Sequence, residues 1–284
     1  MPFTTTIKNA LNYVFAPVNL RIGTLTAERR ETNRIRRLMR VGQFSNPAYP
    51  IFAGLQNFDP NPLCSAFEAF RADVGALMKG GISPGFYDPS NAYFKSPDAE
   101  VLYLIVRTFA PRRIVEIGSG NSTRIVRQAI ADGRLEAEHI AIDPNPRSDI
   151  AGMVDKMHLN HFEDTEANNI FCSLESRDIV FIDSSHEVRV ANDVAKLFCV
   201  TIPSLASGVI VHVHDIFLPF DYPEPFCTRF PHWGEQYLLH VLLLGQGYQV
   251  LWPGYYVQKM RPDLQRALPF LGGGTAQSFW FRRS

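Results

Sequence analysis

The stretch Glu116-Ile-Gly-Ser-Gly-Asn-Ser-Thr123 decides the fold class, because it joins a predicted strand to a predicted helix through two glycines. It ends the β-branched run 113–117 and opens a helical pattern over 122–131. Glycine tolerates positive φ angles and lets a ligand approach the backbone closely. The first turn of a helix adds unpaired N–H groups and the positive end of the helix dipole. The stretch therefore predicts a ligand site at the carboxyl end of a strand.

Further apolar runs on both sides of this stretch predict the rest of the sheet. Strands are expected at 138–143, 156–159, 178–183 and 208–214, a helix at 188–200, and closing strands at 248–252 and 277–281. Apolar strands that alternate with helices are typical of a parallel sheet covered on both faces. We therefore expect an α/β, Rossmann-like, doubly wound sheet, with ligands beyond the carboxyl ends of its strands.

Asp143, at the end of the second predicted strand, is the acidic partner of the glycine loop. A carboxylate there can accept hydrogen bonds from both hydroxyls of a ribose, although Asp143-Pro144 is also compatible with a simple turn. Thr123 stands where the dinucleotide fingerprint has its third glycine, which serves a pyrophosphate. S-adenosylmethionine has no pyrophosphate and carries a charged amino acid, so the loop favours it over a nicotinamide dinucleotide.

With these features the segment 115–122 resembles the first motif of the class I S-adenosylmethionine-dependent methyltransferases, in their small-molecule O-methyltransferase-like branch. The resemblance covers about residues 93–284 and implies a seven-stranded sheet, mostly parallel, with an antiparallel last strand. Phe181-Ile-Asp-Ser-Ser-His186 resembles the fourth-strand motif of the family. The resemblance also implies the residues that contact the cofactor: Glu116, Gly118, Ser119, Gly120, Asn121 and Ser122 around the methionine portion, Asp143 at the ribose, Glu163 or Asp164 at the adenine, and Asp183.

Acidic and histidine side chains are predicted to meet where the fourth and fifth strands end, and they are the candidate catalytic residues: Asp183, His186, His214 and Asp215. In one interpretation a histidine accepts the proton of a substrate hydroxyl as the methyl group arrives. In another, Asp183 and Asp215 bind a divalent metal such as magnesium. Catechol-type O-methyltransferases follow the second aspartate with asparagine, whereas this chain has Ile216, so His186 or His214 could complete a different metal site. In a third, the histidines only fix the loops.

The composition favours a small molecule as the partner. Lys and Arg total 28 and Asp and Glu total 28, so no net charge attracts nucleic acid or an anionic membrane. The four cysteines form no C-x-x-C pair, and no apolar run approaches the roughly 18 residues that span a bilayer. We therefore expect a soluble, cytoplasmic protein without disulfides.

The region that precedes the methyltransferase-like domain differs from it in residue composition. We expect an N-terminal helical extension or cap over residues 1–85 and the domain over 86–284. Six arginines between Glu28 and Arg40 interleave with apolar residues at helical spacing, which is typical of a surface helix that packs on the core or on a second subunit of a homo-oligomer. A proline-rich aromatic loop over 217–226 could line a substrate pocket.

Two other functions fit the same motifs, an NAD(P)-dependent oxidoreductase and a non-catalytic cofactor-binding protein.

Overall fold

The computed structural model describes residues 2–20, 23, 25–80, 87–146, 150, 152–165, 170–227, 233–245 and 247–284, without the side chains of residues 2–6, 27 and 28. The expected domain boundary near residue 85 lies outside the described residues and stays a prediction. The strands are β1 (Arg113–Ile117), β2 (Glu138–Ile142), β3 (Lys156–His158), β4 (Ile179–Ile182), β5 (Ile210–Val213), β6 (Tyr248–Pro253) and β7 (Phe279–Arg283). The helices are α1 (Pro2–Phe15), α2 (Thr26–Arg40), α3 (Ala53–Gln56), α4 (Asn61–Leu77), α5 (Asp98–Phe109), α6 (Asn121–Gly133), α8 (Asp193–Lys196), α9 (Ile202–Ser204), α10 (Glu224–Cys227), α11 (Glu235–Leu244) and α12 (Gly254–Met260).

The strands form one seven-stranded sheet in the order β3-β2-β1-β4-β5-β7-β6. Strands β1 to β5 pair in parallel, and β7 pairs antiparallel with both β5 and β6. The prediction of a doubly wound, mostly parallel sheet with an antiparallel last strand is therefore confirmed. The strand order reverses between β1 and β4, which is the switch point where such sheets bind ligands.

Burial on both faces explains why the central strands contain so few polar residues. All side chains of β4 and β5 are buried, and so are those of β1 after Arg113. Helices α4, α5 and α6 pack against one another in one layer, while α8, α9 and α11 contact the segment Leu197–Thr201, which is π-helical. Asp178 leads into β4, and its carboxylate accepts hydrogen bonds from the backbone N–H groups of Arg112, Arg113 and Glu175.

The predicted helix at 188–200 is wrong at both ends. The helix begins at Asp193, because the Asn192 side chain caps it by accepting a hydrogen bond from the Ala195 N–H, and it continues through α9 to Ser204. Residues 184–191 instead form a loop, in which His186 and Ala191 have positive φ angles of 61° and 58°. The loop therefore keeps His186 close to the end of β4.

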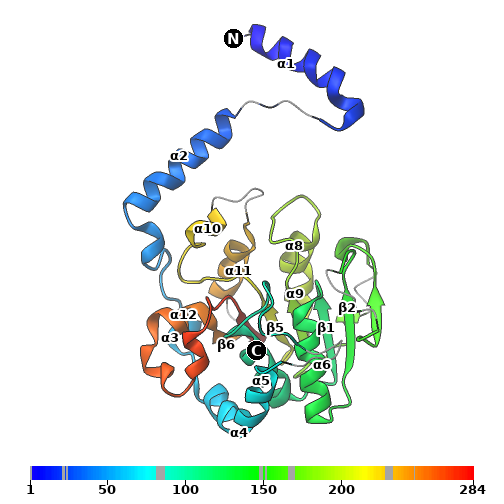
Figure 1. The fold of residues 1–284 in the computed structure, drawn as a ribbon, viewed down its shortest axis with the longest axis vertical. Helices are drawn as coiled ribbons and strands as arrows, with labels where there is room; N and C mark the ends of the chain where they lie inside the picture. The colour runs from blue at the N-terminus through cyan, green and yellow to red at the C-terminus, as the bar shows by residue number, and fades with distance from the viewer. Residues whose placement is uncertain are drawn as a thin grey trace.

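Helices α1 and α2 lie apart from the sheet, above the α/β body in Figure 1. The amphipathic pattern predicted for α2 is present: Ile35 is buried, Leu38 and Met39 are half-buried, and the arginines are exposed. Helix α4, in contrast, packs on α5 and contributes Phe67 and Leu77 to the main core. Among the described residues, no helix combines the length and the apolar character that crossing a membrane requires.

Candidate active site

Gly118 forms the tight turn that follows β1, and its conformation requires glycine. Its φ angle is +79°, and a Cβ atom at this position would lie 1.9 Å from the carbonyl oxygen of Asp183. The Gly118 N–H donates to the Ile142 carbonyl oxygen over 3.0 Å, and the Asp183 N–H donates to the Ile117 carbonyl oxygen over 2.9 Å. The glycine loop therefore lies directly against the end of β4.

Glu116 organises this loop from inside the protein. Its side chain is fully buried, and its carboxylate accepts hydrogen bonds from Ser122 Oγ at 2.5 Å and Thr123 Oγ1 at 2.6 Å. His139 Nε2 lies 3.3 Å from the same carboxylate. Because its oxygens face the first turn of α6, Glu116 supports the shape of the loop, and its predicted contact with the methionine portion stays a prediction.

Asp143 links the ends of β1 and β2. Its Oδ2 accepts hydrogen bonds from the Ser119 N–H at 2.8 Å and from Ser119 Oγ at 2.7 Å, and its Oδ1 accepts one from the Asn145 N–H at 2.8 Å. A carboxylate has about four acceptor positions, and the Ser119 hydroxyl can rotate away. Asp143 therefore retains capacity to accept hydrogen bonds from a ligand.

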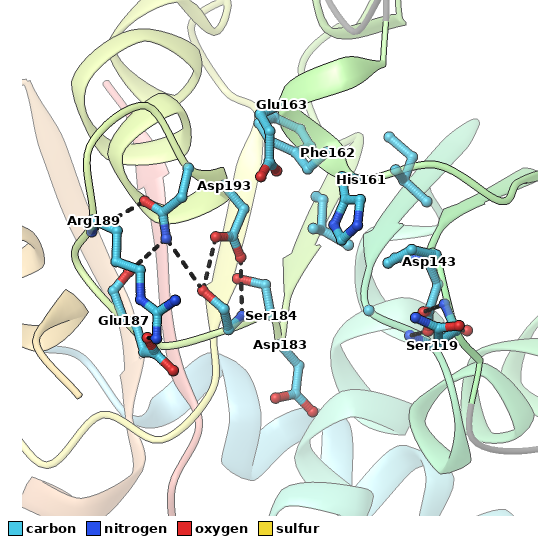
Figure 2. A pocket seen from close by; sticks show the side chains of 17 residues that line it. Ser119, Asp143, His161, Phe162, Glu163, Asp183, Ser184, Glu187, Arg189 and Asp193 are labelled. Atoms are coloured by element: carbon cyan, nitrogen blue, oxygen red, sulfur yellow. Dashed lines mark hydrogen bonds and ion pairs between the residues drawn. The ribbon is translucent and has the colours of Figure 1, made fainter. Parts of the chain in front are cut away.

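A cavity of about 450 Å³ opens at the carboxyl ends of β1 to β4. Figure 2 shows Ser119 and Asp143 on one side, Glu187 and Arg189 on the other, and Asp183 between them in this view. Five predicted cofactor residues line this cavity: Gly118, Ser119, Asp143, Glu163 and Asp183. Four do not line it: Glu116, Gly120, Asn121 and Ser122. Asp164, the alternative to Glu163, is exposed outside the lining.

Phe162 is a cavity residue that the sequence reasoning did not single out. It is 3% exposed, lines the cavity beside Glu163, and packs edge-on against Phe171. The Lys196 ammonium lies 5.5 Å from the centre of the Phe162 ring and donates to the Glu163 carbonyl oxygen at 3.1 Å. An aromatic ring held in this way offers a fixed apolar surface to a planar ligand.

The four predicted catalytic residues meet beside this cavity. His186 Nε2 lies 3.4 Å from Asp183 Oδ1 and 3.5 Å from Asp215 Oδ2. His214 Nδ1 lies 3.8 Å from Asp183 Oδ1 and 3.7 Å from Asp215 Oδ1. Asp183 is one-third exposed, while the other three side chains are buried. Asp183 therefore belongs both to the cavity and to this acid–histidine cluster.

The charges of the cluster determine its protonation. Burial alone would lower the pKa of His186 and His214, but neighbouring carboxylates outweigh burial and raise both well above the usual value: chiefly Glu235 for His186 and Asp215 for His214. Burial would also raise the pKa of Asp183, yet the positive charges of His214 and His186 lower it. The surrounding carboxylates therefore favour the protonated forms of both imidazoles.

Glu235 belongs to the site, although the sequence did not place it among the predicted catalytic residues. It is completely buried, and one of its carboxylate oxygens is hydrogen-bonded to His186 Nδ1. The Gly234 N–H donates to the His186 carbonyl oxygen at 2.9 Å, which ties the start of α11 to the loop after β4. The sequence offered only a glutamate in the first turn of a helix, which the helix dipole explains equally well.

His212 lies behind the cluster, with its ring centre 5.8 Å from that of His214, and the aromatic loop packs elsewhere. His212 is fully buried, stacks on Phe181 with ring centres 4.0 Å apart, and is hydrogen-bonded to Ser278 Oγ at 3.0 Å. The predicted aromatic loop packs its side chains into a separate apolar cluster of Phe217, Phe220, Tyr222 and Tyr255. None of these four rings lines the described cavity.

Comparisons with known proteins agree with this geometry. A family model described as a methyltransferase domain matches residues 115–216, which run from β1 to the end of β5. No curated protein matches the chain.

Similar solved structures include the O-methyltransferase TomG from Streptomyces achromogenes, with 15% identity, a TM-score of 0.42, and 80% of this chain and 91% of that chain covered. An O-methyltransferase from Bacillus cereus has 13% identity and a TM-score of 0.42, with 80% and 92% covered. The methyltransferase PaMTH1 from Podospora anserina has 18% identity and a TM-score of 0.40, with 81% and 92% covered. Residues 115–216 therefore match a methyltransferase domain, and they form the parallel part of the seven-stranded sheet.

Proposed function

We propose that the protein transfers the methyl group of S-adenosylmethionine to a hydroxyl oxygen of a small molecule. The position of Asp183 carries this proposal. Its side chain lines the cavity that follows the glycine loop and lies 3.4 Å from His186 in the acid–histidine cluster. A donor in the cavity and an acceptor at the cluster would therefore meet at one aspartate, and their alignment is the main catalytic task of the fold.

The cavity fits the cofactor in size and in chemistry. Its volume of about 450 Å³ lies within the usual range for small-molecule sites. Asp143 would accept hydrogen bonds from the ribose, and Phe162 with Glu163 would contact the adenine. Gly118 and Ser119 would contact the part of the cofactor that joins the ribose to the methionine portion. Each of these residues holds and orients the donor without taking part in bond changes.

The transfer requires removal of one proton. A bond forms between the acceptor oxygen and the methyl carbon, the bond from that carbon to sulfur breaks, the sulfonium becomes a neutral thioether, and the hydroxyl proton leaves. Of the two catalytic roles predicted for the cluster, the metal site has the better support, because one ligand atom from each of Asp183, His186 and Asp215 lies within 4.8 Å of the others.

The donor set fits a divalent cation. Asp183, His186 and Asp215 each offer one ligand atom, and these atoms all lie within 4.8 Å of one another. When bound there, a divalent cation supplies positive charge that lowers the pKa of a nearby hydroxyl. Asp183 and Asp215 would hold it, and His214, buried between Asp183 and Asp98, would keep the carboxylates in place. Carboxylate or neutral amine acceptors need less help with a proton, so we assign the acceptor as a hydroxyl.

Calorimetry with S-adenosylmethionine and S-adenosylhomocysteine tests the donor site. Asp143→Ala removes a charge-assisted hydrogen-bond acceptor, so we expect affinity to fall by about 10-fold to 100-fold. Asp164→Ala is the matched control, since Asp164 is exposed outside the cavity, and its affinity should stay within about twofold. Absence of binding by either compound to folded protein would refute the donor site. Formation of S-adenosylhomocysteine with a panel of hydroxyl-bearing acceptors tests the reaction.

A further inference from the structure

We infer that Asp183, His186 and Asp215 form a three-ligand site that selects a transition-metal ion over magnesium, with Glu235 as the residue that positions the histidine. The inference deepens the proposed function and rests on it for the use of the ion. The binding of the ion itself depends only on the residues described below.

The spacing of the ligand atoms suits one ion. His186 Nε2 lies 3.4 Å from Asp183 Oδ1 and 3.5 Å from Asp215 Oδ2. Neighbouring ligand atoms at about 2.1 Å from a shared ion, in tetrahedral or octahedral geometry, lie about 3.0–3.4 Å apart. Both histidine–carboxylate distances are therefore within a few tenths of an ångström of this spacing, and all three ligand atoms lie within 4.8 Å of one another.

The orientation of His186 is fixed by its other nitrogen. Nδ1 is hydrogen-bonded to the fully buried Glu235 carboxylate, so Nε2 points towards the two aspartates. The Trp233 ring lies 4.4 Å from the imidazole, centre to centre, and restricts its rotation. A ligating histidine almost always donates its second N–H to a carboxylate or carbonyl, which fixes the tautomer and raises the basicity of the ligating nitrogen. The pair of Glu235 and His186 has this arrangement.

The backbone at two of the three ligands is held in an unfavourable conformation. His186 has φ 61° and Asp215 has φ 57°, both in the left-handed region that costs about 1–2 kcal/mol for a residue with a Cβ atom. The Gly234 N–H bonds the His186 carbonyl oxygen, and the Gln277 side chain is hydrogen-bonded to the Asp215 carboxylate. Such conformations persist where surrounding contacts enforce them, and they concentrate at functional sites.

The ligand chemistry decides which ion is preferred. Magnesium takes oxygen ligands in near-ideal octahedral geometry, whereas imidazole nitrogen suits zinc, iron, cobalt and other transition ions. The residue after Asp215 is Ile216, whose buried side chain offers no further oxygen. One nitrogen and two carboxylate oxygens therefore favour a transition ion, and the two carboxylates balance its divalent charge.

Calorimetric titration of chelator-treated full-length protein with Co(II) or with Mg(II) tests the inference. We expect Co(II) to bind at least about 100-fold more tightly than Mg(II), and His186→Asn to reduce this ratio by about tenfold or more, together with a change in the visible absorption of bound Co(II). Glu235→Gln should weaken Co(II) binding by about 10-fold to 100-fold. The matched controls are His240→Asn and Glu175→Gln, which lie outside the ligand set and outside the cavity and should leave Co(II) affinity unchanged.

Equal Co(II) affinity in the wild type and in folded His186→Asn protein would overturn the inference, as would tighter binding of Mg(II) than of Co(II). If His186→Asn does not fold, Glu235→Gln carries the test, and unchanged Co(II) affinity in that variant has the same meaning. Methyl transfer to hydroxyl acceptors is measured in parallel. Co(II) binding that depends on His186 without any transfer refutes the proposed function alone, whereas transfer with Co(II) affinity independent of His186 refutes this inference alone.

Discussion

Replacing Gly118 with alanine should cost about 3–5 kcal/mol of unfolding free energy. The left-handed φ of +79° alone costs about 1–2 kcal/mol for alanine. The new Cβ would also lie 1.9 Å from the Asp183 carbonyl oxygen, so the loop must move away by more than 1 Å, which we count as an overpacking cost of about 1–3 kcal/mol. That movement strains the hydrogen bonds from the Gly118 N–H to Ile142 and from the Asp183 N–H to Ile117, each worth about 1 kcal/mol.

Urea unfolding followed by circular dichroism measures this cost, with Gly75→Ala as the control. Gly75 lies inside helix α4, and no atom lies within 4 Å of the place that a Cβ would take there. The same substitution at Gly75 should therefore stabilise the protein by about 0.5–1 kcal/mol. The two alanine variants should move the unfolding midpoint in opposite directions. A loss below about 1 kcal/mol for Gly118→Ala would show that the close approach to Asp183 is not a constraint.

Burial raises the pKa of Glu100 from 4.5 to about 7, against the Ser96 hydrogen bond that lowers it. A raised carboxyl pKa means that the folded state binds the proton of Glu100 more tightly than the unfolded chain does. The contribution of Glu100 to the stability of the folded state therefore falls as pH rises from about 4.5 to 7. Between pH 4.5 and 8 the unfolding free energy of Glu100→Gln should therefore rise relative to that of the wild type by on the order of 3 kcal/mol. Unfolding at each pH measures this, and a difference that does not depend on pH contradicts it. Asp178→Ala should cost about 2–4 kcal/mol in thermal unfolding, because it leaves its backbone N–H partners without an acceptor, whereas Asp178→Asn, which keeps an oxygen, should cost less. Phe281→Ala should cost about 3–5 kcal/mol through the cavity it leaves in the core, whereas Tyr13→Ala, at a side chain 85% exposed, should stay within about 0.5 kcal/mol; similar losses for both would contradict the burial of Phe281.

The sheet could be predicted from the sequence because its signals are local. Strands β1, β2, β4 and β6 are short, largely apolar runs followed by glycine or an acidic residue, and burial of the central strands on both faces leaves few polar positions in them. The donor cavity followed from the same rule, since the residues after parallel strands must gather at one edge. Gly118, Asp143 and Asp183 could therefore be placed together from the order of the strands alone.

The loop after β4 could not be predicted in the same way. Residues 188–200 contain enough apolar side chains for a helical pattern, yet the Asn192 cap delays the helix to Asp193. Glu235 reaches His186 through the packing of α11 against this loop, and the two residues are 49 positions apart in the chain. A single sequence contains no local signal for such a contact, because a glutamate in the first turn of a helix is ordinary.

The two halves of the site are mechanically joined at Asp183. Its carbonyl oxygen occupies the space that a side chain at Gly118 would need, while its carboxylate lies next to His186. A displacement of the glycine loop therefore has to move the backbone that carries a proposed metal ligand, and a displacement of that ligand has to move the wall of the proposed donor cavity. Cofactor affinity and metal affinity should consequently change together in variants of the loop. Variants at Glu235, which is hydrogen-bonded to His186 and does not line the described cavity, should change metal affinity alone.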